Sequence, residues 1–156
     1  MKYNFLILLP LLALGACNDS SDSESKDMEY PVITSGSEEA SPSNCQIYER
    51  GGTIPFTYVF TDDTELGAFN IEVHHNFDHH THSTSSVECE MEPNKKALHP
   101  WIFNEDFSIP SGQTTYSPQL EIPIPEDIDT GDYHFVIRVT DRAGWQQICA
   151  VAVKIK

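Results

Sequence analysis

Short runs in which every second residue is apolar make up the globular part of this chain, and this pattern restricts the fold more than any other feature of the sequence. From Tyr30 onward the runs are separated by Pro, Gly, Asp and Ser, and no stretch keeps a 3.6-residue apolar period over three turns. Alternation places apolar side chains on one face of a β-strand, whereas an amphipathic helix needs the longer period. We therefore expect an all-β domain with almost no helix.

Six runs are predicted to be strands. They are Tyr30–Ser35, Ile54–Phe60, Gly67–His75, Leu120–Ile124, Tyr133–Thr140 and Gln147–Ile155. Six or seven such strands over roughly 125 residues are enough for two packed sheets that bury a core of their own. Residues 30–156 are therefore predicted to form an immunoglobulin-like or fibronectin-type β-sandwich of about seven strands.

Residues 129–133, with the sequence Asp-Thr-Gly-Asp-Tyr, have the D-x-G-x-Y form seen where immunoglobulin-like domains enter strand F. Tyr133 is therefore the predicted tyrosine corner, whose hydroxyl bonds back to an upstream backbone group. The segment between His82 and Ile109 shows no clear period, and long loops of this kind are usually functional or carry a small subelement. Its aromatic residues are expected to pin it to the body of the domain. These residues are Trp101, Phe103 and Phe107.

Residues 1–16 are predicted to be a signal peptide. One lysine precedes an apolar run from Phe5 to Leu14, which at about ten residues is too short to span a bilayer core of roughly 30 Å. The ending Leu-Gly-Ala-Cys resembles the bacterial lipobox, in which cleavage before the cysteine leaves a thiol that carries diacylglycerol. Cys17 is therefore the expected lipidation site. The alternative is an ordinary secretory signal that is cut after Ala16 and leaves Cys17 unmodified.

Residues 17–29 are predicted to be an acidic, flexible tether, because they hold no aromatic residue and too little apolar surface to offset the entropy of ordering them. Acidic residues behind a lipidated cysteine resemble the export tags of Bacteroidota lipoproteins; the alternative is a merely solvated linker. We expect an outer-membrane lipoprotein of the cell envelope, on the periplasmic face or at the cell surface. The net charge of −15 argues against nucleic acid as a partner, because phosphate binding needs clustered Lys and Arg.

Five of the seven histidines lie in the nine positions from His74 to His82. Neutral imidazole is a common ligand of transition metals, and several nitrogens must converge on one ion. His80 and His82 share a face if the segment is extended, and His74, at the end of a predicted strand, has the same parity. The spacing therefore predicts a metal site to which these three histidines contribute.

A fourth nitrogen is expected from His134. If the aromatic residues that flank it point into the core, His134 points out of it, and its strand neighbours the strand that ends near His74 in an immunoglobulin-like sheet. Asp78 is expected as a fifth ligand or as an acceptor that fixes an imidazole tautomer. The two other histidines of the cluster have the opposite parity. They are expected to support the ligands from behind, to face solvent, or to be ligands themselves if the backbone turns. They are His75 and His79.

The same window resembles a known family. The sequence H-H-N-F-D-H-H-T-H after a strand, the acidic run Phe60 to Leu66 before it, and the later Gly-Asp-Tyr-His-Phe and Asp-x-x-Gly segments look like uncharacterised Bacteroidota lipoproteins with an immunoglobulin-like domain. The resemblance covers roughly residues 30 to 155, and it implies the fold, the anchor and a metal site but no reaction. By motif it carries over His74, Asp78, His80, His82 and His134.

Nitrogen-dominated ligation favours Zn²⁺, with Cu²⁺ second, over Ca²⁺ and Mg²⁺, which prefer oxygen. Such a site weakens as imidazoles protonate, near and below about pH 6.5. An enzyme is not expected, because the sequence shows no H-E-x-x-H motif and no nucleophile elbow. A metal-dependent hydrolase is the alternative, with Glu88, Glu90 or Glu92 as its general base.

Three cysteines follow Cys17, and outside the cytoplasm a pair of them is expected to oxidise. Cys149 alternates with the apolar residues that follow it, so it is expected to be a small core residue. The expected disulfide therefore joins Cys45 and Cys89. The alternative is that Cys89 joins a soft metal site that favours Cu⁺.

Together these features predict a monomeric metal-binding protein that serves metal acquisition, sequestration or delivery. It would be held on the membrane through lipidated Cys17, near an outer-membrane receptor or transporter. The competing class is a surface adhesion or glycan-binding module, in which the histidines only shape a loop. In that class Trp101 and Phe103 would be exposed and would contact the ligand.

Overall fold

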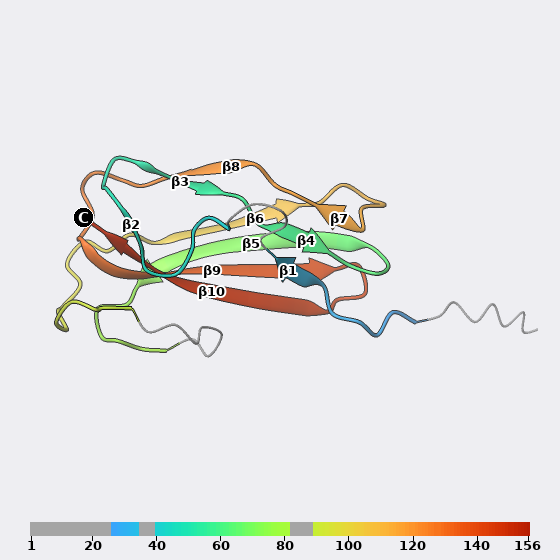
Figure 1. The fold of residues 1–156 in the computed structure, drawn as a ribbon, viewed down its shortest axis with the longest axis horizontal. Helices are drawn as coiled ribbons and strands as arrows, with labels where there is room; N and C mark the ends of the chain where they lie inside the picture. The colour runs from blue at the N-terminus through green and yellow to red at the C-terminus, as the bar shows by residue number, and fades with distance from the viewer. Residues whose placement is uncertain (1–25, 35–39, 82–88) are drawn as a thin grey trace, which may run out of the picture.

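The computed structural model describes residues 26–34, 40–81 and 89–156, and within these ranges it contains ten strands and no helix. Nothing helical in these ranges is therefore long or apolar enough to cross a membrane. The strands, labelled in Figure 1, are β1 (Val32–Thr34), β2 (Gln46–Tyr48), β3 (Thr53–Phe56), β4 (Val59–Thr61), β5 (Leu66–His75), β6 (Phe103–Ser108), β7 (Thr115–Tyr116), β8 (Leu120–Pro123), β9 (Gly131–Asp141) and β10 (Gln146–Ile155).

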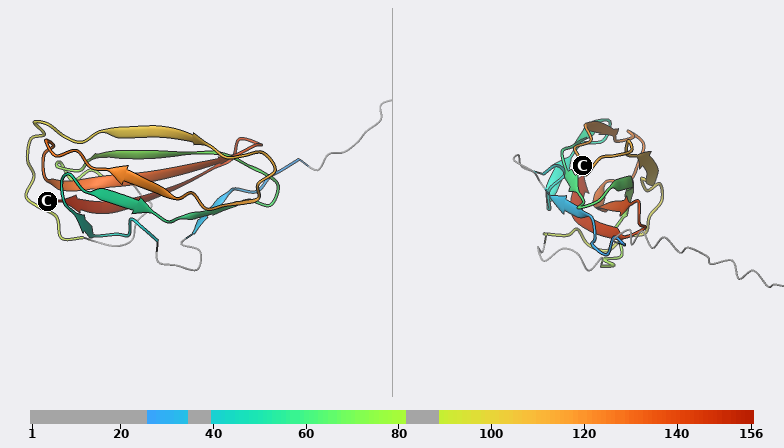
Figure 2. Two further views of the ribbon diagram at one scale, coloured as in Figure 1. Left: turned by 90° about the horizontal axis from the view of Figure 1, so that it is seen from above. Right: turned by 90° about the vertical axis from the view of Figure 1, so that its right-hand side faces the viewer.

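One layer of the domain is a five-stranded sheet with the order β2-β10-β9-β5-β6. β5, β9 and β10 are its long central strands, and each pairs with its neighbour in antiparallel register. β2 adds to the edge of β10 in parallel register. Figures 1 and 2 show these strands running along the length of the molecule, with the remaining strands stacked on one side of them.

The other layer is made of two long strands that are each broken once. β3 pairs with β8, β4 pairs with β7, and β1 adds to β4. The register is the same on both sides of the break, since Phe56 lies opposite Leu120 and Phe60 lies opposite Tyr116. Pro118 lies in the break, where a residue without a backbone N–H cannot continue a ladder.

The predicted β-sandwich is confirmed. When β3 with β4 and β7 with β8 are each counted as one strand, and β1 with β2 as a first strand that passes from one sheet to the other, the ten strands reduce to the expected seven. The first strand then borders both layers, and β2 lies parallel to the last strand. This arrangement is the one expected of an immunoglobulin-like sandwich.

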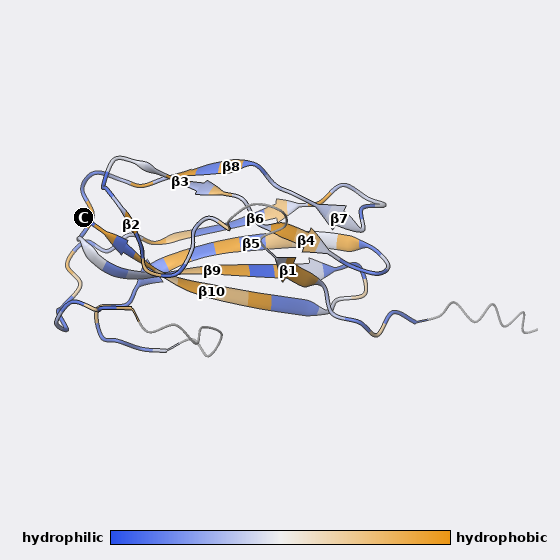
Figure 3. Cartoon of the chain, in the orientation of Figure 1, coloured by the Kyte–Doolittle hydropathy of each residue, from blue (hydrophilic) through white to orange (hydrophobic). Residues whose placement is uncertain are grey.

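The core lies between the two layers and is rich in phenylalanine. The ring of Phe56 from β3 stacks 6.2 Å from Phe69 of β5 and 6.0 Å from Phe135 of β9, so one side chain bridges the layers. Figure 3 shows apolar segments on the long strands and mainly polar residues in the connections at both ends. Cys149 also packs against this core, as expected.

The sequence did not predict β6, because only two of its six residues are apolar and its outer face is polar. Phe103 and Phe107 are half-buried and pin this edge strand to the core, which agrees with the role expected for them. Trp101 is only 4% exposed, so the hypothesis that Trp101 and Phe103 form an exposed binding surface is wrong. The Trp101 ring packs 6.3 Å from the Tyr133 ring instead.

Tyr133 forms the predicted tyrosine corner. Its hydroxyl donates a 2.6 Å hydrogen bond to the backbone oxygen of Asp129 and accepts a 3.2 Å hydrogen bond from the backbone N–H of Trp101. Burial raises the pKa of the Tyr133 hydroxyl, which therefore stays a neutral donor. One side chain thus joins β9 to the long segment that precedes β6.

Tyr133→Phe is expected to lower the free energy of unfolding by about 1–3 kcal/mol, because it leaves a half-buried carbonyl and a buried N–H without their partner. Urea unfolding measures this loss. The matched control is Tyr116→Phe, which removes a hydroxyl from a ring that packs on Phe69. Equal losses in the two variants would contradict the corner's role.

Candidate metal centre

β5 and β9 bring two of the predicted histidines together. His74 lies directly opposite His134 in the antiparallel register of these strands. The preceding pair, Val73 and Phe135, points into the core and is fully buried, so by alternation the two histidines lie on the outer face of the sheet. His134 is nevertheless only 8% exposed, because the chain after β5 folds back over this face.

The turn after β5 supplies the third histidine. His79 adopts a left-handed backbone conformation with φ 58°, and its N–H bonds to the oxygen of Asn76. The turn carries the His80 ring over the sheet, where it lies 5.3 Å from the His74 ring and 5.0 Å from the His134 ring. One ring nitrogen from each of these three histidines lies within 4.8 Å of the other two.

Two carboxylates lie beside the rings, and one of them makes a hydrogen bond. Glu72 Oε1 lies 2.9 Å from His74 Nδ1, and Asp78 Oδ1 lies 2.6 Å from His80 Nδ1. The hydrogen bond with His80 holds the pKa of the exposed Asp78 carboxyl below its ordinary value. The hydrogen bond between Asp78 and His80 Nδ1 fixes the direction of the His80 ring and leaves its Nε2 as the nitrogen that could face an ion, an arrangement common around histidine ligands.

The structure distributes the predicted site residues among several positions. His74, His80 and His134 come together, and Asp78 contacts His80 rather than joining the group of donor atoms. His82 lies outside the described residues, so its predicted ligand role stays a prediction. The other two histidines face elsewhere: the His75 ring packs 4.9 Å from the Phe77 ring, and His79 Nε2 lies 2.8 Å from the backbone oxygen of Glu92.

Glu72 was missed by the sequence analysis. It lies two residues before His74, so the period of a strand puts both side chains on the same face. An acidic residue two positions before His74 was the available signal. It gained meaning only once the structure placed His74 beside two other histidines.

A disulfide fastens the segment that covers the site. Cys45 and Cys89 are bonded, which ties the start of this segment, residues 89–95 and called the return segment below, to the residue before β2. The alternative in which Cys89 serves a soft metal site is wrong in this structure, because its sulfur is bonded to Cys45. Cys149 is a free thiol whose pKa is raised by burial, so it stays protonated, packed against the core.

An open groove of about 1040 Å³ leads to the histidines in the described part of the molecule. His80 and His134 line it together with the small residues Ala150 and Ala152 of β10. An ion can therefore approach His80 and His134 from solvent without unfolding the core.

The acidic residues considered as a general base do not form a catalytic pair with the histidines. The carboxylate of Glu92 lies 3.5 Å from Lys95 Nζ, and Glu90 is exposed. Glu88 lies outside the described residues. Neither Glu90 nor Glu92 is therefore seen to pair its carboxylate with one of the converging histidines.

The fold and this site define a β-sandwich domain with three converging histidines on the outer face of one sheet. The chain belongs to the family described as Domain of unknown function (DUF4625), whose model matches residues 16–156. No curated protein matches the chain.

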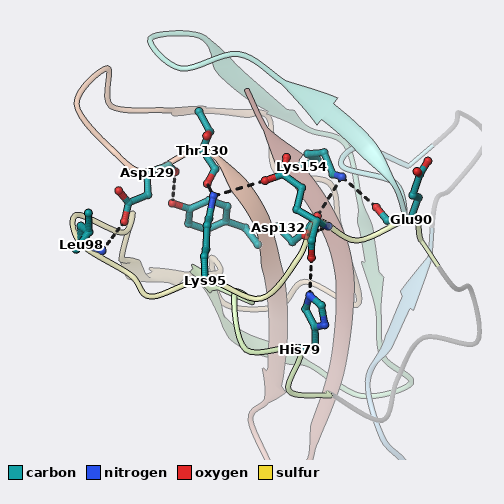
Figure 4. Close-up of polar contacts among 10 residues, drawn as sticks. His79, Glu90, Lys95, Leu98, Asp129, Thr130, Asp132 and Lys154 are labelled. Carbon is teal, nitrogen blue, oxygen red and sulfur yellow. Dashed lines mark hydrogen bonds and ion pairs between the residues drawn. The ribbon is translucent and has the colours of Figure 1, made fainter.

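A neighbouring loop at the same end of the domain is held by Asp129. Its carboxylate accepts hydrogen bonds from the backbone N–H groups of Leu98 and His99, both at 2.7 Å, and Figure 4 shows the contact with Leu98. These hydrogen bonds, that from His99 first, hold the pKa of Asp129 below its ordinary value. A depressed pKa in the folded state stabilises the fold above the unfolded value of about 3.9 and stops doing so as the pH falls through the folded value.

Asp129→Asn is therefore expected to be less stable than the parent at neutral pH, and the difference should shrink as the pH falls from about 5 to about 2. Urea unfolding of both proteins at several pH values measures it. A difference in stability that stays constant over this range would show that the charge of Asp129 does not contribute.

Proposed function

We propose that this protein binds one transition-metal ion, Zn²⁺ first and Cu²⁺ second, and serves metal acquisition, sequestration or delivery at the cell envelope. The observation that carries the proposal is the convergence of ring nitrogens from His74, His80 and His134 within 4.8 Å. His82, which has the parity of His74 and His80, is the proposed fourth ligand.

The chemistry of the donors supports this choice of ion. All three are imidazole nitrogens, which suit zinc and copper, while the nearby carboxylates of Glu72 and Asp78 are engaged with ring nitrogens. The site also lies on the outer face of a sheet whose core is complete without it, since the buried apolar cluster lies between the two layers. Loss of the ion would therefore leave the sandwich folded, which suits a cargo ion.

The proposed lipid anchor is compatible with the position of the site. The described chain begins at the turn between β9 and β10, where Trp145 Nε1 donates a 3.1 Å hydrogen bond to the oxygen of Asp27. His134 lies seven residues away from the end of β9 at Asp141, about 23 Å along the strand. Figure 1 shows the blue N-terminal segment leaving at that end. A lipid at Cys17 would thus be attached through the end of the sandwich opposite the histidines.

A protein-binding role is the second candidate, and it now rests on different residues. Leu98 is 82% exposed and Ile102 is 74% exposed, and Ile102 directly precedes β6, the neighbour of the strand that carries His74. Exposed apolar side chains beside the site suit a protein partner that receives or delivers the ion.

The protein purified without an added histidine tag is expected to contain or take up one zinc or copper ion per chain. His80→Ala together with His134→Ala should abolish this binding, because two of the three described donors are lost. Elemental analysis and titration with zinc at neutral pH measure the stoichiometry, and zinc at about 100 times its Kd should add about 2.7 kcal/mol to the free energy of unfolding.

The matched control is His99→Ala, which removes an exposed histidine outside the cluster. It should leave the metal content unchanged. A parent protein that takes up no stoichiometric metal, or a double variant that keeps it, would contradict the proposal and direct the search to the exposed apolar residues.

Cys17→Ala is expected to release the protein from the membrane fraction of the cells that produce it, because the thiol that would carry diacylglycerol is gone. Detergent phase partitioning of parent and variant measures the change. If the two partition alike, Cys17 carries no lipid, and the metal-binding proposal is unaffected.

A further inference from the structure

The turn that carries His80 is held by a network of contacts that does not include the three converging nitrogens. Its first residue, Asn76, is 5% exposed and donates its N–H to the backbone oxygen of Asp132 at 2.8 Å. Its second residue, Phe77, accepts a 3.1 Å hydrogen bond from the N–H of Lys95, whose ammonium lies 4.5 Å above the Phe77 ring. The turn is therefore fixed from β9 on one side and from the return segment on the other.

His79 makes the contact next to the ligand itself. Its ring Nε2 lies 2.8 Å from the backbone oxygen of Glu92, and because a carbonyl only accepts, Nε2 must carry the proton and donate it. This nitrogen is therefore unavailable as a metal ligand. The left-handed backbone of His79 also turns the chain so that the following residue, His80, points back over the sheet.

Asp132 holds the other end of this connection. It is 8% exposed, and its Oδ2 accepts a 2.7 Å hydrogen bond from the N–H of Glu92. Lys154 of β10 lies 3.4 Å from Asp132 Oδ1 and donates a 3.0 Å hydrogen bond to the backbone oxygen of Glu90. Figure 4 shows His79, Asp132 and Lys154 meeting at the return segment. A buried carboxylate two residues before His134 thus fastens the segment to which the His80 turn is bonded.

We propose that Asp132 and His79 are positioning residues of the metal centre, which hold the His80 turn over the outer face of the sheet before the ion arrives. The inference rests on the proposed function and deepens it, because part of the affinity for the ion would then depend on residues that do not bind the ion themselves. A site that is already ordered does not lose conformational entropy when the ion binds, so it binds more tightly. Contacts of this indirect kind typically change metal affinity by about 10- to 100-fold.

Two variants test the positioning role without removing a ligand. Asp132→Ala removes the acceptor of the Glu92 N–H. His79→Gly removes the ring while keeping a residue that readily adopts a positive φ. His79→Gln is the conservative rescue, because its amide can donate to the Glu92 oxygen from a similar reach. Asp129→Ala is the matched control, since Asp129 also accepts backbone N–H groups at this end of the domain but contacts residues 98 and 99 instead.

Three measurements are made on each purified chain. Competition with a chelator gives the Kd for zinc, and the electron paramagnetic resonance spectrum of the copper-loaded protein reports the nitrogen ligands. Amide hydrogen exchange of residues 76–80 in the metal-free protein reports whether the turn is already held. The last measurement does not depend on metal binding.

We expect Asp132→Ala and His79→Gly to raise the Kd about 10- to 100-fold while keeping the nitrogen signature of the parent, and to speed exchange in the metal-free turn. His79→Gln should recover most of the affinity, and Asp129→Ala should lower thermal stability without changing the Kd. Unchanged exchange in both positioning variants, or Kd values equal to that of the parent, would overturn the inference and leave the proposed function standing. A parent that binds neither zinc nor copper would overturn both.

Discussion

The antiparallel pairing of β5 with β9 is the constraint on which both the core and the candidate site depend. One register sets Val73 opposite Phe135 inside the sandwich and His74 opposite His134 outside it. Because side chains alternate with a period of two, a slip by one residue would move the histidines into the core and the apolar pair into the covered groove. The buried face therefore enforces the geometry of the outer face.

The start of β9 has a second role, because several connections at one end of the domain meet there. Tyr133 reaches inward and joins the backbone at Asp129 and Trp101, while Asp132 reaches outward to the return segment. Neighbouring residues of one strand thus hold a loop on each side of the sheet. The candidate centre lies next to this well-bonded region, so its third histidine, although on a turn, is placed by contacts to a rigid strand.

The strands that the sequence predicted best are those in which burial of one face produces a regular alternation of apolar and polar residues. β5, β9 and β10 each bury one face, and their alternation is visible without any structure. β6 was missed because only two of its residues, both phenylalanines, pack against the core, while its other residues are polar and exposed. Two apolar residues make too short an alternating pattern to distinguish a strand from a loop. Trp101 was expected to pin its loop to the domain, and its buried ring beside Tyr133 confirms this; only the competing surface-module class required it to be exposed.

Sequence alone determined the all-β class, the tyrosine corner and the set of histidines worth considering, because alternation, a short turn motif and residue clustering are local properties of the chain. It also brought His134 to the site, since the order of strands in an immunoglobulin-like sheet makes distant strands neighbours in a foreseeable way. The tertiary structure alone decided that His79 donates its Nε2 proton to a backbone oxygen, that Glu72 lies beside His74, and that Asp132 fastens the return segment. It also decided between the two roles expected for Asp78, which bonds to the His80 ring. These roles depend on distances between segments, and a turn with a left-handed residue directs its side chains in ways that residue spacing does not encode.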